Sequence, residues 1–417
     1  MRAAMGKRSH RPITVPGFRF SGIHAGIKGE GALDLGLIEV RGPRGAPGRV
    51  AATFTRSLAA AAPVLVSRPV AASGRVRALV VNSGNANACT GRRGLRDARA
   101  MVRLTARALG VDAREVLVAS TGVIGAPLPM AAIQRGLPHG AQALTETGLP
   151  AFAEAIRTTD RSAKMAVRRV RVDGTEVTIA GAAKGAGMIG PDMALATDAP
   201  GHATMLAFIC TDAGVALPLL RRLTREAVDR TFNAITVDGD TSTNDAVFVM
   251  SSGQARHRTL TRRADLAPVE AAVHAVMLEL AQAIVADGEG AAHVFQVEVR
   301  GAGSDAEARR LARRIAASPL VKTMVYGEDP NWGRVVAAAA SAGVPVDPER
   351  LSVAIGGVTI YRRGRWQGAA VEAKARARMH RPCVSLRIDV HRGGGACTLW
   401  ASDLTETYVR INAGYRS

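Results

Sequence analysis

The chain has 417 residues, 47% of them hydrophobic, and its 55 basic and 35 acidic residues give a formal net charge of +20. This length and apolar content suffice for one large core or two moderate ones, so the chain is predicted to be globular. The apolar runs stop short of the ~18 residues that span a bilayer, and residues 1–12 lack the apolar segment of a signal peptide. We therefore expect a cytoplasmic protein without a membrane partner.

The net charge raises nucleic acid as a partner. The arginines, however, are scattered along the chain in pairs, and aromatic residues that could stack on bases make up only 4%. The simplest interpretation of the charge is a solvated basic surface. An arginine-rich nucleic-acid binder stays open as the non-enzymatic alternative. The cysteines show neither CxxC pairs nor zinc spacing, so we expect reduced thiols and no metal; they are Cys89, Cys210, Cys383 and Cys397.

Strands and helices can both be predicted from hydrophobic periodicity. Alternation or β-branched content predicts strands at residues 115–121, 164–173, 175–181, 294–301, 351–357 and 384–392. Apolar residues at three-and-four spacing predict helices at residues 95–109, 218–232, 268–287 and 305–318. Strands follow strands as often as they alternate with helices, which favours a mixed α/β fold of layered sheets with helices outside. The stretch "VRGAGSD" at 299–305 is interpreted as the hinge into a C-terminal lobe.

Several familiar motifs fail in their context. "GAGMIG" at 185–190 matches GxGxxG, but the Pro and Gly residues of "PDMALATDAPGH" at 191–202 prevent the phosphate-binding helix that must follow. No P-loop, HExxH or GxSxG pattern occurs in the sequence. A dinucleotide cofactor and the common hydrolase sites are therefore not expected.

Polar, glycine-rich segments recur where strands or helices end. Each alone is typical of a turn, but together they indicate a site carried on a rigid scaffold. They are residues 82–91, 120–125, 182–193, 233–245, 287–292 and 327–334. Within "GHATMLAFICTDA", a cut between Ala203 and Thr204 would place a free α-amine beside a β-hydroxyl. One residue would then supply both a base and a nucleophile.

The segments "GIHAGIK", "NSGNANACTG", "STGVIG", "KGAGMIGPDM", "ATMLAFICTDA", "ITVDGDTSTND", "GEDPNWGR" and "LTETYVRINAGYRS" occur in order over nearly the whole chain. They resemble the ornithine acetyltransferase family, the glutamate N-acetyltransferases of arginine biosynthesis. The resemblance implies a layered αββα fold with a C-terminal lobe from about 300, and self-cleavage before Thr204. It also implies an α chain of residues 1–203, a β chain of residues 204–417, and an α2β2 assembly.

The resemblance also implies the site residues. It assigns Thr204 as nucleophile and the Thr121 hydroxyl with the Gly122 N–H as the oxyanion hole. The residues that it implies for substrate binding are Thr158 or Thr159, Lys184, Thr204, Glu289, Asn412 and Ser417. Of these, Glu289 would bind the side-chain amine of ornithine. Asp238, Asp240 and Asp245 are interpreted as structural support.

The implied reaction moves an acetyl group from N2-acetylornithine to glutamate through acyl-Thr204, without a cofactor. Some family members also use acetyl-CoA as donor. Two alternatives stay open: a self-processing amidase or aminopeptidase, and a paralogue acting on another acyl amine. Ala292 and His293, where the family more often has Thr and Lys, depart from the pattern and keep the paralogue open.

A second departure is "PDMALATDAPGHATML", which carries nine or ten extra residues before Thr204 and creates a second Ala–Thr bond at Ala196–Thr197. Thr204 is the better candidate because the apolar "MLAFI" after it can form a buried strand. Thr197 is followed by "DAPGH", which cannot.

Overall fold

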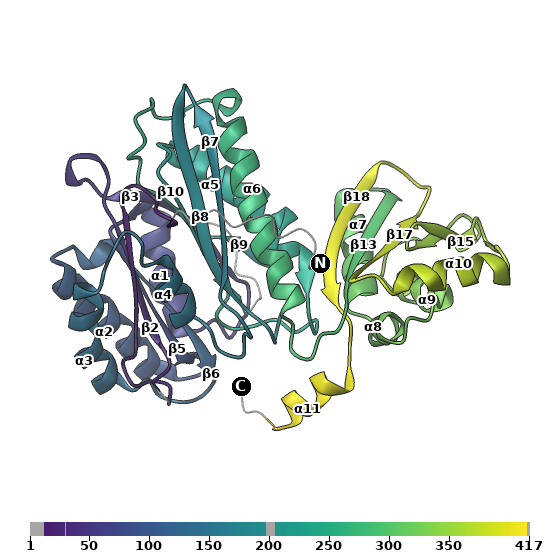
Figure 1. Ribbon diagram of the computed structural model, residues 1–417, viewed down its shortest axis with the longest axis horizontal. Helices are drawn as coiled ribbons and strands as arrows, with labels where there is room; N and C mark the ends of the chain where they lie inside the picture. Colours follow the sequence, from purple (N-terminus) through teal and green to yellow (C-terminus); the bar gives the residue numbers. More distant parts are fainter. Residues whose placement is uncertain (1–11, 30, 197–204, 415–417) are drawn as a thin grey trace. The chain divides into compact units, whose positions relative to one another are not determined.

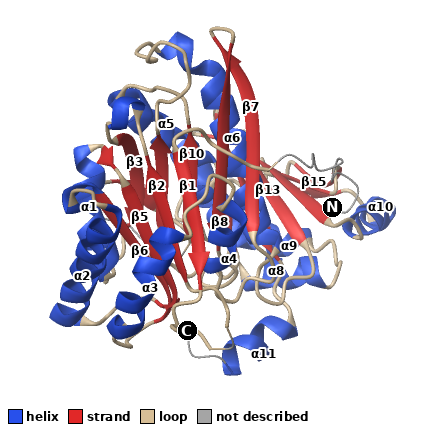
Figure 2. Ribbon diagram, turned by 60° about the vertical axis from the view of Figure 1, so that its left-hand side comes forward, coloured by secondary structure: helices blue, strands red, loops and turns tan. Residues whose placement is uncertain are grey.

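The computed structural model describes residues 12–29, 31–196 and 205–414 (Figures 1 and 2). These residues form two compact units. The sandwich unit comprises residues 12–233 and 240–284, and the C-terminal unit comprises residues 234–239 and 285–414.

Two sheets form the centre of the sandwich unit. One has the order β1-β2-β5-β6, and the other has the order β4-β3-β12-β10-β8-β7, with β9 paired to β3. The pairs β5–β6 and β10–β12 are parallel, and the other pairs are antiparallel. The strands are β1 Phe18–Ile23, β2 Leu35–Val40, β3 Gly48–Thr55, β4 Arg75–Val76, β5 Ala78–Asn85, β6 Val116–Val123, β7 Lys164–Val172, β8 Thr175–Lys184, β9 Met193–Leu195, β10 Leu206–Thr211 and β12 Ala246–Ser251.

The two sheets share one core, because alternate residues of each strand face the other sheet. Phe208 of β10 stacks on Phe248 of β12 with ring centroids 5.6 Å apart, and it meets Phe152 edge-on at 5.1 Å. Phe20 of β1 and Phe54 of β3 belong to the same buried cluster. This core holds the ends of the strands in place around the candidate site.

Helices cover the outer face of each sheet (Figure 1). Val80 and Val118 of the smaller sheet pack against Met101 and Ile133 of two of these helices. The order of layers is therefore helix, sheet, sheet, helix, which confirms the predicted αββα class. The helices of the unit are α1 Ala62–Ser73, α2 Gly91–Leu109, α3 Met130–Gln142, α4 Leu149–Ala155, α5 Leu217–Arg230 and α6 Arg263–Ala286. Of these, α4 contributes buried residues to the core between the two sheets.

The helix α6 differs from its sequence prediction. It begins at Arg263, ahead of Pro268, because a proline near the N-terminus removes only one backbone hydrogen bond. An 18-residue window of α6 has a mean hydropathy of 1.5, so its length and composition alone would allow it to cross a membrane. Half of that window is buried, and Leu280 packs against Gly181 of β8, as expected of a helix that covers a sheet.

The C-terminal unit is one sheet of order β11-β18-β13-β17-β14-β15-β16. The helices α7 to α10 contribute to a single buried cluster with one face of this sheet. The stretch 299–305 is not a hinge, since Val299–Ala302 is the end of β13 and Ser304 caps α7 inside the unit. The elements are β11 Ile235–Thr236, β13 Val294–Ala302, α7 Asp305–Ala316, α8 Pro319–Tyr326, α9 Trp332–Ala340, β14 Ser352–Ile355, β15 Val358–Arg362, β16 Arg365–Trp366, α10 Ala369–Met379, β17 Cys383–Asp389, β18 Gly395–Ser402 and α11 Glu406–Gly414.

Candidate active site

The predicted oxyanion-hole residues lie at the end of β6, beside β5. The register pairs Thr121 with Ser83 and Gly122 with Gly84, and it becomes irregular just beyond them. Gly122 has a φ of 131°, and a Cβ there would lie 2.3 Å from the carbonyl carbon of Gly84. Only glycine fits this close approach, so the two strands end in a fixed backbone arrangement next to the buried Thr121.

Asn244 connects this strand end to the other sheet. Its buried side-chain amide donates to the main-chain oxygens of Ala86, at 2.6 Å, and Ser120, at 2.8 Å. Asn244 lies two residues before β12, so the loop after β5 and the end of β6 are both held against the start of β12. Asn244 belongs to the polar segment 233–245, but its role was not predicted from the sequence.

The strand β10 runs between β8 and β12. Leu206, its first residue, pairs with Lys184 of β8 and with Ala246 of β12, and Ala246 N donates to Met205 O at 3.0 Å. The predicted cleavage pair Ala203 and Thr204 lies outside the described residues, as do Ser417 and Thr197. The described chain resumes at the buried Met205, so β10 begins beside Lys184.

Lys184 belongs to a buried cluster of charges. Its Nζ lies 3.9 Å from Asp160 Oδ2, and Lys164 Nζ donates to Asp160 Oδ1 at 2.7 Å. Burial alone would raise the pKa of Asp160, but the charges of the two lysines and a hydrogen bond from Gly185 N hold that pKa well below its usual range. Asp160 is therefore ionised and holds both lysines in place.

Asp160 also orders the turn that carries Thr158 and Thr159. The N–H of Thr158 donates to Asp160 Oδ2 at 3.0 Å, and both threonines are partly exposed. The structure thus ties the Thr158–Thr159 turn and Lys184 to one carboxylate. Asp160 was not predicted from the sequence, although it directly follows Thr158 and Thr159 in "RTTD".

Asp245 is a buried carboxyl at the start of β12. Neither of its oxygens has a hydrogen-bond partner among the described residues. Burial raises its pKa well above the usual range, and the positive charge of Lys184 opposes that shift. The side chain therefore favours its protonated form more than an ordinary aspartate does.

A second lysine that sequence analysis missed, Lys28, lies near this site. Its Nζ donates to Leu33 O at 2.9 Å and Arg157 O at 2.6 Å, and a Cβ on Gly84 would come within 3.0 Å of its Cγ. Burial, helped by the charge of Lys184 and opposed by that of Asp34, lowers the pKa of Lys28 to about 8. In the sequence Lys28 ends the motif "GIHAGIK", which could have indicated it, but no role was assigned to that motif.

The loop before Lys28 is shaped by one buried aspartate. Asp34 accepts hydrogen bonds of 2.6–3.1 Å from four successive backbone N–H groups, those of residues 25–28. These N–H groups have no partner in a helix or a sheet, and the Asp34 carboxylate accepts their hydrogen bonds instead. The position of Lys28 is therefore set by the backbone and not by its own long side chain.

Two more predicted residues lie together in the C-terminal unit. Asn412 of α11 donates to Glu289 Oε2 at 3.0 Å. The loop of Glu289 is fixed nearby, because Asp403 accepts from the N–H groups of Ala292 and His293, both at 3.0 Å. His293 Nδ1 lies 2.9 Å from Asp403 Oδ2. His293, one of the two residues that depart from the family pattern, therefore helps to fix this loop through Asp403.

The described residues contain no group of three or more His, Cys, Asp or Glu side chains arranged to hold a metal ion. The GxGxxG match at residues 185–190 leads into β9, and no helix follows it before residue 196. The site as described offers hydroxyl, amide and ammonium groups on strand ends. Such a set suits acyl transfer with an anionic substrate.

A protein-family model described as the ArgJ family matches residues 19–417. The "Arginine biosynthesis bifunctional protein ArgJ" of Geobacter sulfurreducens is 45% identical over 406 residues, which cover 97% of this chain and 100% of that protein. Its namesake from Symbiobacterium thermophilum is 45% identical over 410 residues, 97% of this chain and 98% of that protein. The crystal structure of the "Arginine biosynthesis bifunctional protein argJ" from Bacillus halodurans matches with 42% sequence identity and a TM-score of 0.49. The match covers 51% of this chain and 100% of the chain in that structure.

Proposed function

Because the chain belongs to the ArgJ family, we propose that it transfers an acetyl group from N2-acetylornithine to glutamate in arginine biosynthesis. The family match carries this proposal. The arrangement of Thr121, Gly122 and Lys184 near the start of β10 supports it. We propose Thr204 as the nucleophile, with Thr158 or Thr159, Lys184, Glu289, Asn412 and Ser417 binding the substrates.

The nucleophile requires a prior cut. In the proposed maturation the Thr204 hydroxyl attacks the carbonyl carbon of Ala203, the C–N bond breaks as the nitrogen takes up the proton, and water then hydrolyses the ester. The products are a carboxylate at Ala203 and a free amine and hydroxyl at Thr204. Residues 1–203 and 204–417 then stay together, in an α2β2 assembly by analogy with the family.

In the transfer step the Thr204 amine takes the hydroxyl proton as Oγ attacks the acetyl carbon of the donor. A free α-amine has a pKa of about 7.7–8.0, which suits a base near neutral pH. The positive charges of Lys184 and Lys28 would lower that pKa further and increase the fraction of free base. Thr121 and Gly122 donate hydrogen bonds to the oxyanion.

Collapse of the tetrahedral intermediate breaks the C–N bond, and the leaving ornithine takes the proton from the Thr204 amine. The α-amine of glutamate then attacks the acyl ester by the same route in reverse. Lys184 would pair with the α-carboxylate shared by both substrates, and its contact with the ionised Asp160 supports this role. Glu289 would bind the side-chain amine of ornithine.

The test incubates purified protein with N2-acetylornithine, with and without glutamate, and measures ornithine, N-acetylglutamate and acetate. N-acetylglutamate formed in step with ornithine supports the proposal. Acetate released without glutamate would identify an amidase, and inertness toward acetylornithine would point to another acyl amine. An arm with acetyl-CoA in place of acetylornithine tests a second donor. Thr204→Ala is the control and should remain one inactive chain of 43.5 kDa by intact mass.

A further inference from the structure

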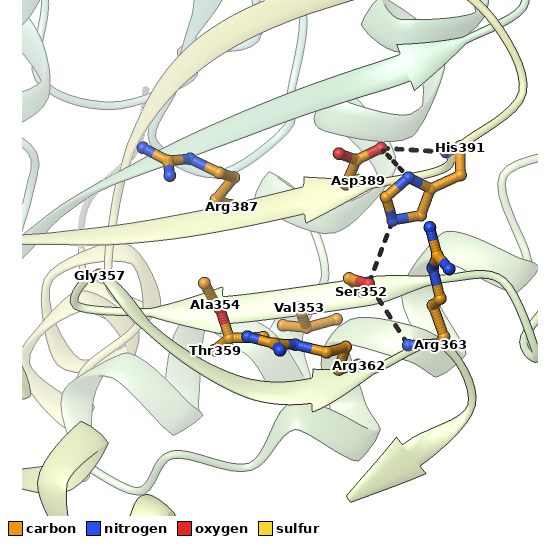
Figure 3. A pocket seen from close by; sticks show the side chains of 10 residues that line it. All are labelled: Ser352, Val353, Ala354, Gly357, Thr359, Arg362, Arg363, Arg387, Asp389 and His391. Atoms are coloured by element: carbon orange, nitrogen blue, oxygen red, sulfur yellow. Dashed lines mark hydrogen bonds and ion pairs between the residues drawn. The ribbon is translucent and has the colours of Figure 1, made fainter. Parts of the chain in front are cut away.

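The C-terminal unit holds a second concave site on the sheet face opposite its helices. The strands β13 and β17 alternate buried and exposed residues, so one face packs on the core and the other is polar. On the polar face, between β17, β14 and β15, lies a cavity of about 470 Å³ (Figure 3). This volume is in the range of small-molecule sites.

The lining of this cavity is strongly basic. Arg362, Arg363 and Arg387 line it, and Asp389 is the one carboxylate among its described lining residues. Arg387 already donates to Glu298 Oε2 at 2.7 Å, so Arg362 and Arg363 carry the unbalanced charge. Among the described residues, no carboxylate forms an ion pair with Arg362 or Arg363. Asp389 is itself engaged by His391, whose Nδ1 lies 3.2 Å away and whose N–H donates to the same Oδ1 (Figure 3).

Two features of the β15–β16 hairpin that involve its arginines are unfavourable for its stability. Its two-residue loop, Arg363 and Gly364, has φ values of 42° and 79°, where the first position normally takes Asn, Asp or Gly. Arg362 and Arg365 are directly opposite each other across the strands, and like charges in that position destabilise a hairpin. A bound anion would offset the repulsion between these two charges.

Neutral donors accompany the guanidinium groups. Ser352 Oγ lies 3.2 Å from His391 Nε2 and accepts from Arg363 N at 3.3 Å, which fixes the rim (Figure 3). The Thr359 hydroxyl lines the cavity and has no hydrogen-bond partner among the described residues. The lining contributed by the described part of the chain has no aromatic side chain, which disfavours recognition of a nucleobase by stacking.

From this arrangement we propose that the C-terminal unit binds a phosphate or pyrophosphate group in this cavity. Arginine forks match phosphate oxygens in pairs, and the Thr359 hydroxyl adds a donor in the lining. The group is either free inorganic anion or part of a larger phosphorylated metabolite. The cavity shares no lining residue with the proposed acyl-transfer site, and the proposal does not depend on that function.

Calorimetric titration of the full-length protein with inorganic phosphate, pyrophosphate and AMP tests the assignment. We expect saturable binding of one pyrophosphate per chain. Arg362→Ala with Arg363→Ala should weaken it at least about tenfold, since charge-assisted hydrogen bonds are lost. The conservative Thr359→Val should weaken it about fivefold without changing charge, as expected for one neutral hydrogen bond.

The matched control is Arg310→Ala with Arg314→Ala on α7, where both side chains are exposed on the helical side of the sheet. It removes the same charge and should leave binding unchanged. An equal loss in both double variants would show attraction to the overall positive charge, and the absence of saturable binding would also overturn the proposal. Tighter binding of AMP than of phosphate or pyrophosphate would identify a metabolite as the source of the group.

Discussion

The side-chain amide of Asn244 donates a hydrogen bond of 2.8 Å to the main-chain oxygen of Ser120, next to Thr121. This bond joins the start of β12 in one sheet to the end of β6 in the other. The same amide also donates to Ala86, so one side chain fixes both strand ends of the smaller sheet.

Asn244→Ala should therefore lower both stability and turnover. The change leaves two buried carbonyl oxygens without a donor, which costs about 1–3 kcal/mol in the free energy of unfolding. Acetyl transfer should fall because Thr121 is no longer held in register. Denaturant unfolding and the transfer assay measure the two effects. Gln254→Ala is the control, since its amide forms one exposed hydrogen bond to Arg41 O. A full rate in a destabilised Asn244→Ala protein would contradict the positioning role.

Thr121→Ala should fold normally and lose about 10²–10³ in transfer rate, because one of the two proposed oxyanion donors is removed. Its maturation should slow as well, since the cut passes through a similar oxyanion. Gel analysis of the two chains after expression reports the cut, and the rate of N-acetylglutamate formation reports transfer. Turnover equal to that of the unaltered protein would remove Thr121 from the mechanism.

The inserted stretch before Thr204 should slow the cut. Residues 193–195 form β9, in which the buried Leu195 pairs with Thr53. A deletion of residues 197–202 spares this strand and also removes the alternative Thr197. We expect faster processing and a second chain that begins at Thr204, read by N-terminal sequencing.

A variant with residues 197–202 replaced by Gly and Ser at equal length separates length from composition. If length slows the cut, this variant should process as slowly as the natural chain. A deletion protein that stays uncut would show that Thr197 had been the cleavage residue.

Lys28 should make stability depend on pH above neutrality. Its pKa falls from 10.5 to about 8 on folding, mainly through burial, so between these values the unfolded chain binds more protons than the folded one. Stability therefore rises with pH across that window.

Lys28→Met removes this contribution. As pH rises from 8 to 10.5, the unfolding free energy of the natural protein should increase relative to that of the variant. Lys374→Met, at an exposed position on α10, is the control and should give a difference that does not vary in the same window. A difference independent of pH for Lys28→Met would show that its pKa is not lowered.

The sequence by itself determined the class of fold and a part of its elements, six of the strands and four of the helices. The six predicted strands lie within β6, β7, β8, β13, β14 and β17 or overlap them closely, because alternation reports one buried face directly. After the GxGxxG match the described chain forms β9 and no helix as far as residue 196, as the Pro and Gly residues there predicted. The boundary of the C-terminal unit was misplaced, because "VRGAGSD" has the composition of a loop while its first residues complete a central strand.

Only the tertiary structure decided which strand ends meet. Asn244, Asp160 and Lys28 lie far from Thr121 and Lys184 in the sequence, and the sheet order brings them to the same region. Local periodicity shows which side of a segment is buried, but not which partner it has. The roles of these polar residues arise from burial, which makes each unpaired hydrogen bond or charge costly, and burial belongs to the assembled layers.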